Sequence, residues 1–403
     1  MPRWSPRTSL FVLVTVLCAL AAPPLAVAAP STPTEPKPCT NRHAPPPPVD
    51  TSEVPAPGRP TPTPLPIPAT PIGGNRMGEC RLVLPSGAPR LPKNLTAASW
   101  VVSDVDTGTV LAGKDPHGRQ RPASLIKVLL ALVVIDELRP EKVITATRQD
   151  AGQECTCIGI VRGQRYSVED LLTGLLIRSG NDAAHALGTA LGGTDVALHK
   201  MNNLAAKIGA HDTRAATTSG LDGPGMSSSA YDLSLILSHA LRQPRFTHAI
   251  ATKQMQFRTE KGKPPITLYN DNRLLGEYPG FLGGKTGFTD DSRHTYAGAA
   301  QRDGRTLAVV LLRAEQRPIR VSEQAAKLLD YGFRLTNLGS APVGELAEPA
   351  EPEVIVDAAA DADDDAAGSD GSGGSLPALA LVIAGVALLC IIALRRTGKR
   401  TPA

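Results

Sequence analysis

Ser124 and Lys127 form the first pair of residues in the chain whose types and spacing suit a chemical reaction. They follow Pro122, which suits the first turn of a helix, and residues three apart on a helix share a face. The apolar run 128–135 has no polar stripe, so this helix should be buried. Burial lowers the pKa of a lysine amine, and a neutral amine can take the proton of a serine hydroxyl. Ser124 and Lys127 are therefore a candidate nucleophile and base, although this motif taken alone favours the plainer interpretation of a capping serine beside a snorkelling lysine.

Two later tripeptides also carry polar side chains at places where chemistry is common. Ser179-Gly180-Asn181 lies at the predicted junction of two helices, and Lys285-Thr286-Gly287 lies on a predicted strand after two glycines. Each tripeptide alone is an ordinary turn or strand end. Their occurrence in this order after Ser124-Leu125-Ile126-Lys127 is much more informative than any of the three alone.

The elements that must position these residues follow from the hydrophobic periodicity. Period-two segments indicate strands near the start and end of residues 92–338, and helical spacing fills the middle. The sequence therefore predicts an α/β domain in which both ends of the chain build one antiparallel sheet and the middle forms a helix-rich lobe. The predicted strands are 97–105, a return strand from 109, 283–289, 294–300 and 306–312, and the predicted helices are 124–138, 168–177, 181–191, 195–208, 230–241 and 324–333. Ser167 and Asp182 are candidate helix caps.

The two ends of the chain have compositions typical of export and membrane attachment. Residues 1–28 read as a signal peptide, with two arginines, an apolar run and a small-residue cleavage site. Residues 376–394 carry no charge and are long enough to cross a bilayer, and the basic tail 395–403 should stay cytoplasmic. We expect a single-pass protein of the cell membrane whose body lies outside the cytoplasm. A buried core helix is the alternative for 376–394.

Linkers are predicted on both sides of the domain. Residues 29–91 are rich in proline, with 16 prolines in 30–71, and predict a semi-rigid polyproline spacer. Residues 339–375 are rich in aspartate, alanine, glycine and serine, which predicts a solvated flexible stalk.

The cysteines and the charge exclude some classes of function. Cys39, Cys80, Cys155 and Cys157 lie outside the predicted membrane segments, and we expect Cys39 to pair with Cys80. Cys155 and Cys157 either pair with each other or stay reduced. A Cys-x-Cys without a nearby histidine is a poor zinc site, and the eight histidines do not cluster, so we expect no metal and no cofactor. The net charge of +4 includes no Lys/Arg-rich patch with interleaved aromatic residues, so nucleic acid is not an expected partner.

The three motifs together resemble those of the penicillin-binding D-alanyl-D-alanine carboxypeptidases, which are serine peptidases of the β-lactamase/transpeptidase-like fold. The resemblance covers residues 92–338 and is supported by Ser219-Gly220-Leu221-Asp222 and by Phe288-Thr289 after the third motif. It implies peptidoglycan stem peptides ending in D-Ala-D-Ala as substrates and β-lactams as covalent inhibitors. The proline-rich leader and the C-terminal anchor look like those of actinobacterial members.

The resemblance also implies a role for each motif residue. Ser124 attacks the peptide carbonyl, Lys127 is the base, and Ser179 relays a proton to the leaving amine. Asn181 hydrogen-bonds the peptide, and Lys285 acts electrostatically beside the substrate carboxylate. Substrate contacts are further implied for Thr286, Gly287, Phe288 and Thr289, with the two threonines as candidates for the carboxylate and the backbone amides of Ser124 and Phe288 as the oxyanion hole.

Three alternatives stay open at this point. A β-lactamase would use the same nucleophile, but class A enzymes need a glutamate for deacylation, and the only glutamates between Asn181 and Lys285 are Glu260 and Glu277, neither in a matching context. A catalytically silent wall-binding scaffold would fit the leader and the stalk. Endopeptidase and transpeptidase activity are possible with the same residues. The sequence also leaves open whether Arg293 binds a carboxylate, and we expect it to face water.

Overall fold

The computed structural model describes residues 39–154 and 156–347. The predicted signal peptide 1–28, membrane helix 376–394 and tail 395–403 lie outside the described residues, as do 29–38 of the first linker and most of the second. Within the described ranges, no helix is long and apolar enough to cross a membrane.

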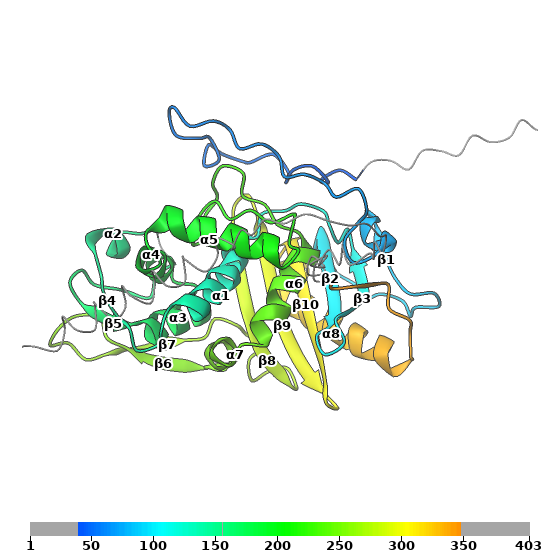
Figure 1. Cartoon of the computed structure of the whole chain (residues 1–403). Helices are drawn as coiled ribbons and strands as arrows, with labels where there is room; N and C mark the ends of the chain where they lie inside the picture. The colour runs from blue at the N-terminus through cyan, green and yellow to red at the C-terminus, as the bar shows by residue number, and fades with distance from the viewer. Residues whose placement is uncertain (1–38, 155, 348–403) are drawn as a thin grey trace, which may run out of the picture. The chain divides into compact units, whose positions relative to one another are not determined.

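A seven-stranded antiparallel sheet is the centre of the fold (Figure 1). It combines β2 (Ser99–Asp104) and β3 (Thr109–Lys114) from the front of the domain with β8 (Phe281–Thr289), β9 (Arg293–Arg302) and β10 (Arg305–Ala314) from the back. The two ends join where β10 pairs with β2, with Val310 opposite Val101. The order is β1-β3-β2-β10-β9-β8, and β11 (Gly344–Glu345) also pairs with β3. The prediction of one sheet built from both ends is therefore confirmed, and β1 (Leu82–Val83) and β11 extend it beyond 92–338.

Alternating side chains of the sheet enter two separate hydrophobic cores. Val101 and Val310 pack with α6 (Ala230–Leu241) and the lobe, whereas Trp100 and Val309 pack with α8 (Val321–Asn337). Because successive strand residues point to opposite faces, the two helices cover opposite faces of the sheet.

The helical lobe follows the predicted elements closely (Figure 1). The opening segment is a 3-10 turn, η2 (Ala123–Ile126), that continues as α1 (Lys127–Glu137), and α1 packs against α3 (Val168–Ile177), α4 (Asn181–Ala190) and α5 (Thr194–Lys207). The unpredicted elements are short: η1 (Asn75–Gly78), α2 (Arg148–Ala151), α7 (Pro244–Ala251), the two-stranded sheet of β4 (Val143–Thr145) and β5 (Arg165–Ser167), and the hairpin of β6 (Gln254–Phe257) and β7 (Ile266–Tyr269).

The two predicted caps have different outcomes. Ser167 caps α3, because its Oγ accepts from Asp170 N at 3.0 Å. The prediction for Asp182 is wrong, because the residue before α4 is Gly180 and the buried Asp182 lies inside the first turn. Its carboxylate accepts hydrogen bonds from the backbone amides of residues 158–160 at 2.9–3.1 Å. Asp182 thus holds the loop after Cys157 against the start of α4.

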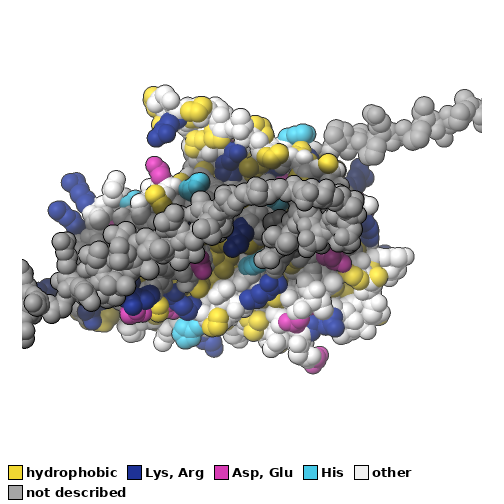
Figure 2. All heavy atoms as spheres, viewed as in Figure 1, with side chains coloured by type: hydrophobic (Ala, Val, Ile, Leu, Met, Phe, Trp, Pro, Cys, Tyr) yellow, Lys and Arg dark blue, Asp and Glu magenta, His cyan; other side chains and the backbone are white. Residues whose placement is uncertain are grey.

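The proline-rich leader differs from the predicted spacer, because its described part is bound to the body. Cys39 and Cys80 form a disulfide with a Cα–Cα distance of 5.2 Å, which confirms the expected pairing. The buried Arg119 guanidinium donates to the carbonyls of His43, Leu65 and Pro66 at 2.7–2.9 Å. Figure 2 shows mainly apolar side chains and backbone along this upper segment, with few charges. The composition of the leader predicted an extended spacer. The hydrogen bonds that attach it to the body use its backbone carbonyl groups, and such bonds leave no hydrophobic pattern in the sequence.

Of Cys155 and Cys157, the structure describes only Cys157. Cys157 is disulfide-bonded, which excludes a reduced thiol at this position. Cys155 lies outside the described residues, so its pairing stays a prediction.

Candidate active site

Ser124 lies in the 3-10 turn at the start of the opening helix, where three parts of the chain meet. Ala123 before it has a φ of 48°, and Gly220 beside it has a φ of 85°. A Cβ on Gly220 would lie 2.0 Å from Ala123 O and 2.9 Å from Ser124 N, and a Cβ on Gly287 would lie 3.0 Å from Ser124 N. The two glycines therefore let the 219–222 loop and strand β8 approach the backbone of Ser124 closely.

Lys127 is fully buried directly beneath Ser124. Its Nζ donates to Ser124 Oγ at 2.9 Å, to Asn181 Oδ1 at 2.8 Å and to the carbonyl of Ser219. Burial lowers the pKa of Lys127 well below its usual value, and the positive charge of Lys285 lowers it further. The three partners of the amine are neutral, so its charge is poorly compensated. The predicted pair of a serine and a desolvated amine is present at hydrogen-bond distance.

Asn181 is held between Lys127 and the loop before it. Its Oδ1 accepts from Lys127 Nζ, and its Nδ2 donates to the carbonyl of Glu154 at 2.7 Å. Since Nδ2 carries two hydrogens, one remains for a contact in the cleft. The predicted contact to a peptide is therefore compatible with the geometry, but positioning Lys127 is a contact that the sequence analysis missed.

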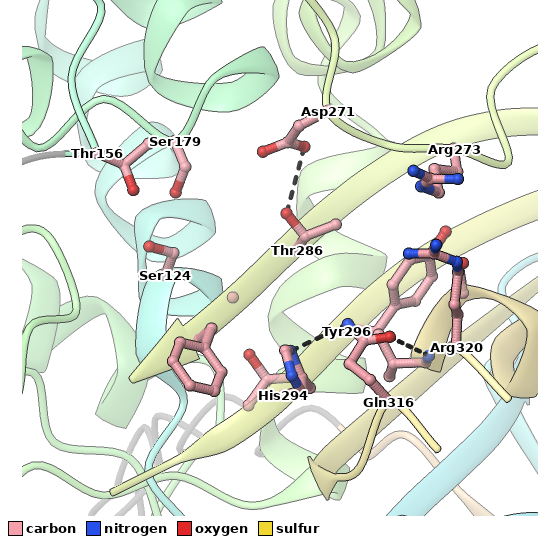
Figure 3. A pocket seen from close by; sticks show the side chains of 15 residues that line it. Ser124, Thr156, Ser179, Asp271, Arg273, Thr286, His294, Tyr296, Gln316 and Arg320 are labelled. Carbon is pink, nitrogen blue, oxygen red and sulfur yellow. Dashed lines mark hydrogen bonds between the residues drawn. The ribbon is translucent and has the colours of Figure 1, made fainter. Parts of the chain in front are cut away.

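Ser179 lies across the cleft from Ser124 in an unusual backbone conformation. It has a φ of 59° and is buried, and it lies between α3 and α4. Figure 3 shows the hydroxyls of Ser124, Ser179 and Thr156 turned toward the same space. A left-handed backbone costs a non-glycine residue about 1–3 kcal/mol and persists where the surroundings impose it. Thr156 was not predicted, because nothing in its local sequence marks it.

The third motif lies on strand β8. Lys285 is buried, and its Nζ donates to Thr286 O at 2.7 Å. Burial lowers the pKa of Lys285, while the charge of Asp271 opposes that shift. Thr286 Oγ1 donates to Asp271 Oδ1 at 3.2 Å, and the side chain points into the cleft (Figure 3). The three motifs therefore converge on one place, as the sequence analysis required.

Ser124 stands where two hollows of opposite charge meet. The first, of about 340 Å³, is lined by Thr286 and by the charged side chains of Arg273, Arg320 and Asp271, so that basic groups outnumber acidic ones (Figure 3). The second, of about 390 Å³, is lined by Asn181 and Thr289 together with several carboxylates. The two threonines of the third motif thus face different hollows, and Phe288, which is 48 % exposed, borders both.

Other residues singled out in the sequence lie outside this site. Arg293 pairs with Glu315 at 3.0 Å, and both side chains are exposed, which agrees with the expectation that Arg293 faces water. Glu260 and Glu277 line neither hollow.

Comparison with known proteins places the chain among peptidases. The family described as D-alanyl-D-alanine carboxypeptidase matches residues 87–316. DacB2 of Mycobacterium tuberculosis, a D-alanyl-D-alanine carboxypeptidase, is 44 % identical over 269 residues, which cover 66 % of this chain and 90 % of that protein. DacD of Escherichia coli, with the same description, is 36 % identical over 256 residues, which cover 60 % of this chain and 64 % of DacD.

Solved structures give the same result. A D-alanyl-D-alanine carboxypeptidase of Mycobacterium tuberculosis aligns with a TM-score of 0.62 and 42 % identity, covering 65 % of this chain and 99 % of that one. A variant of a Streptomyces DD-transpeptidase aligns with a TM-score of 0.57 and 27 % identity, covering 60 % of this chain and all of that one. The predicted fold class is therefore confirmed.

Proposed function

Because the chain belongs to the D-alanyl-D-alanine carboxypeptidase family of serine peptidases, we propose that Ser124 cleaves the terminal D-Ala-D-Ala bond of peptidoglycan stem peptides through an acyl-enzyme. The single observation that carries this assignment is the contact of Ser124 Oγ with the amine of a fully buried lysine at 2.9 Å. The family and its activity favour the enzyme over a silent scaffold. A β-lactamase is not favoured by the relatives.

Acylation begins with transfer of the Ser124 proton to Lys127. The amine accepts it because burial and the charge of Lys285 favour its neutral form. Ser124 Oγ then bonds to the carbonyl carbon, and the negative charge that develops on the carbonyl oxygen is stabilised by the backbone amides of Ser124 and Phe288. The closeness of residue 287 to Ser124 N supports this pairing of amides. Asn181 keeps the amine of Lys127 in position throughout.

Collapse of this intermediate breaks the peptide bond. Ser179, which faces Ser124 across the cleft, gives its hydroxyl proton to the leaving amine of D-alanine and is reprotonated by the proton that Lys127 took from Ser124. Water then attacks the ester that remains on Ser124, and the stem peptide shortened by one D-alanine is released. A β-lactam reacts in the same way, and its opened ring is then bound to Ser124 as an ester.

The terminal carboxylate of the substrate is assigned to the basic hollow. Among the described residues, Arg273 and Arg320 line it beside a single carboxylate, that of Asp271, which accepts from Thr286, and a substrate carboxylate is stabilised by the guanidinium groups. Thr289 lines the hollow that contains the carboxylates, and these would repel the carboxylate of a substrate. We therefore assign the carboxylate to the hollow that Thr286 lines and not to the one that Thr289 lines.

We also propose that the body acts outside the cytoplasm while residues 376–394 hold it to the cell membrane as a single pass. The charge-free run, its basic flank and the signal-like residues 1–28 support this location.

The test is the product formed from two synthetic substrates, a pentapeptide ending in D-Ala-D-Ala and a cross-linked dimer. We expect the wild-type chain to release D-alanine from the pentapeptide, Ser124→Ala to release none, and Ser86→Ala, an exposed serine of the leader, to match the wild type. Mass spectrometry of the products also separates carboxypeptidase from endopeptidase activity. Release of D-alanine by Ser124→Ala at the wild-type rate would overturn the assignment.

A further inference from the structure

The leader forms a wall of the catalytic cleft. Asp50 and Ser52, both in the proline-rich leader, line the same hollow as Ser124 and Asn181. They lie outside residues 87–316, the part of the chain that the family model matches. The carboxylate of Asp50 has a defined orientation, because its Oδ1 accepts from Ser52 N at 2.8 Å.

Buried charges of the body hold this wall in place. Arg121 is 2 % exposed; its Nη2 donates to Glu53 Oε2 at 2.8 Å and its Nη1 donates to Pro46 O at 2.7 Å. On the other side, the backbone amide of Val49 donates to the buried carboxylate of Asp291. Residues on both sides of Asp50 are therefore anchored, and an unpaired Arg121 or Asp291 would be costly to leave buried. The wall is part of the folded site.

The hollow behind this wall is strongly acidic. The charged side chains that line it are four carboxylates, those of Asp50, Glu154, Asp222 and Asp290, and within the described part of the chain no lysine or arginine lines it. Asp222 Oδ1 is buried and lacks a hydrogen-bond partner among the described residues. Like charges lining one cleft sum their potentials, so the hollow attracts cations and repels anions.

The charge of the two hollows fixes a direction for the substrate, given the function proposed above. The leaving D-alanine carries its carboxylate into the hollow with Arg273 and Arg320. Ser124 lies at the junction of the hollows, so the acyl part of the peptide extends the other way, into the acidic hollow. A group that suits that hollow is an ammonium.

We propose that the leader is a specificity element, in which Asp50 favours stem peptides whose acyl side carries a free amine over the same peptides without it. Asp50 is the residue to test, because it is exposed at the wall and touches no catalytic group. An exposed charge pair contributes little, so we expect a preference of about two- to five-fold from Asp50. The preference should weaken as salt is raised, because exposed charges are screened over about 10 Å at 0.1 M ionic strength.

The experiment compares two tripeptides, lysyl-D-Ala-D-Ala with a free side-chain amine and its side-chain acetylated form, both blocked at the N-terminus. The ratio of their kcat/KM values is measured for the full chain, for Asp50→Asn and for the matched control Asp303→Asn. Asp303 is an exposed aspartate in the β9–β10 turn and lines neither hollow. We expect a ratio above one in the wild type and in Asp303→Asn, a ratio lowered about two- to five-fold in Asp50→Asn, and unchanged kcat/KM for the acetylated peptide.

Two results overturn the inference, and a third overturns the function beneath it. A wild-type ratio of one would remove the preference for an amine, and an unchanged ratio in Asp50→Asn would remove the role of the leader. If neither peptide releases D-alanine and penicillin does not acylate Ser124, the proposed function itself fails. Acylation by penicillin therefore distinguishes failure of the proposed specificity from failure of the proposed function.

Discussion

The catalytic centre and the leader contacts both bury basic side chains, with opposite consequences. Lys127 has only neutral hydrogen-bond partners, and burial lowers its pKa well below the usual value. Arg121, which is also buried, meets the carboxylates of Glu53 and Asp291, and its pKa is raised even though burial works against it. Arg119 likewise pairs with Asp212.

The difference shows that the partners of a buried cation decide what it can do. Without a carboxylate, the amine gives up its proton readily and can act as a base. With a carboxylate, the guanidinium keeps its charge and binds carbonyl groups of a distant segment. The protein thus uses a buried cation without a carboxylate partner for the reaction, and a buried cation with carboxylate partners to attach the wall of the cleft.

The largest expected effect comes from Lys127→Arg, which keeps the positive charge but removes a base that can be deprotonated at usable pH. General base catalysis contributes about 10²–10⁴-fold, so acylation by a β-lactam should slow by that factor. In the wild type the rate should rise with pH as Lys127 loses its proton, with a midpoint below that of an ordinary lysine. Stopped-flow kinetics of acylation measure both the loss of rate in Lys127→Arg and the pH dependence of the wild type. The control is Lys207→Arg, which replaces an exposed lysine of α5. Near-normal acylation in Lys127→Arg would remove lysine from the role of base.

The next effect concerns the attachment of the leader. Glu53→Gln removes the charge that pairs with Arg121, and a hydrogen bond to a charged group contributes about 1.5–3 kcal/mol. Hydrogen exchange of the backbone amides of residues 49–53 should therefore speed up about ten-fold or more. Glu79→Gln breaks an exposed pair with Arg76 in the same leader and should have little effect. Equal exchange in the two variants would show that the anchor is not where we place it.

A smaller effect follows from His117, which joins the leader to the body. Its Nδ1 contacts Asp212 at 2.7 Å and its Nε2 contacts Ile72 O at 3.0 Å. Burial alone would lower the pKa of His117, but the hydrogen bond and charge of Asp212, with the charge of Asp232, outweigh it and raise the pKa. Asp115 and Arg119 are the other charged neighbours of this cluster.

The sign of the pH dependence follows from this shift. A group whose folded pKa is raised stabilises the fold fully below its unfolded pKa, here 6.5, and that stability is lost as pH rises through the folded value. Asp232, whose pKa burial raises to about 7, acts in the same direction between 3.8 and about 7. Each group contributes at most about 1.4 kcal/mol per pH unit. Thermal unfolding from pH 6 to 8 should show a falling midpoint, whose slope is smaller in His117→Gln because only the contribution of Asp232 remains, and unchanged in His248→Gln, which replaces an exposed histidine. A flat wild-type curve would contradict this.

The smallest effect sharpens the contrast between the two hollows. Arg320→Gln removes one exposed cation from the basic hollow, and exposed pairs contribute about 0.2–1 kcal/mol. The preference for a peptide with a free terminal carboxylate over its amide should fall up to about five-fold. Arg148→Gln, an exposed arginine of α2, is the matched control. The kcat/KM ratio of the two peptides reports the effect, and an unchanged ratio would place the carboxylate elsewhere.

Hydrophobic periodicity predicted the large elements well. Helices 168–177 and 230–241 match α3 and α6 residue for residue, because each begins at a serine cap and continues as an apolar face. The two-stranded sheets β4–β5 and β6–β7 were missed, since their strands are three or four residues long and mostly polar or exposed.

Only those residues of the site that belong to a recognisable motif could be predicted from the sequence. Ser124, Lys127 and Asn181 were found because their spacing is distinctive, whereas Thr156 and Asp50 carry no local signal. Asp182 was predicted to be a cap because it lies at the start of a helix. Its actual partners, the backbone amides of residues 158–160, precede it by more than 20 positions and could not be recognised from the sequence. The leader was read as a spacer because the contacts that hold it come from buried arginines of the body. Such contacts depend on the tertiary fold, which composition does not report.

The most direct test of the account is to locate the penicillin adduct on the intact chain. The protein is incubated with penicillin, digested, and analysed by tandem mass spectrometry at pH 7. We predict one adduct, on the hydroxyl of Ser124, that is absent in Ser124→Ala and forms at least a hundred-fold more slowly in Lys127→Arg, about the lower limit for loss of a general base. An adduct on another residue, or full labelling of Ser124→Ala, would contradict the convergence of the three motifs on one nucleophile.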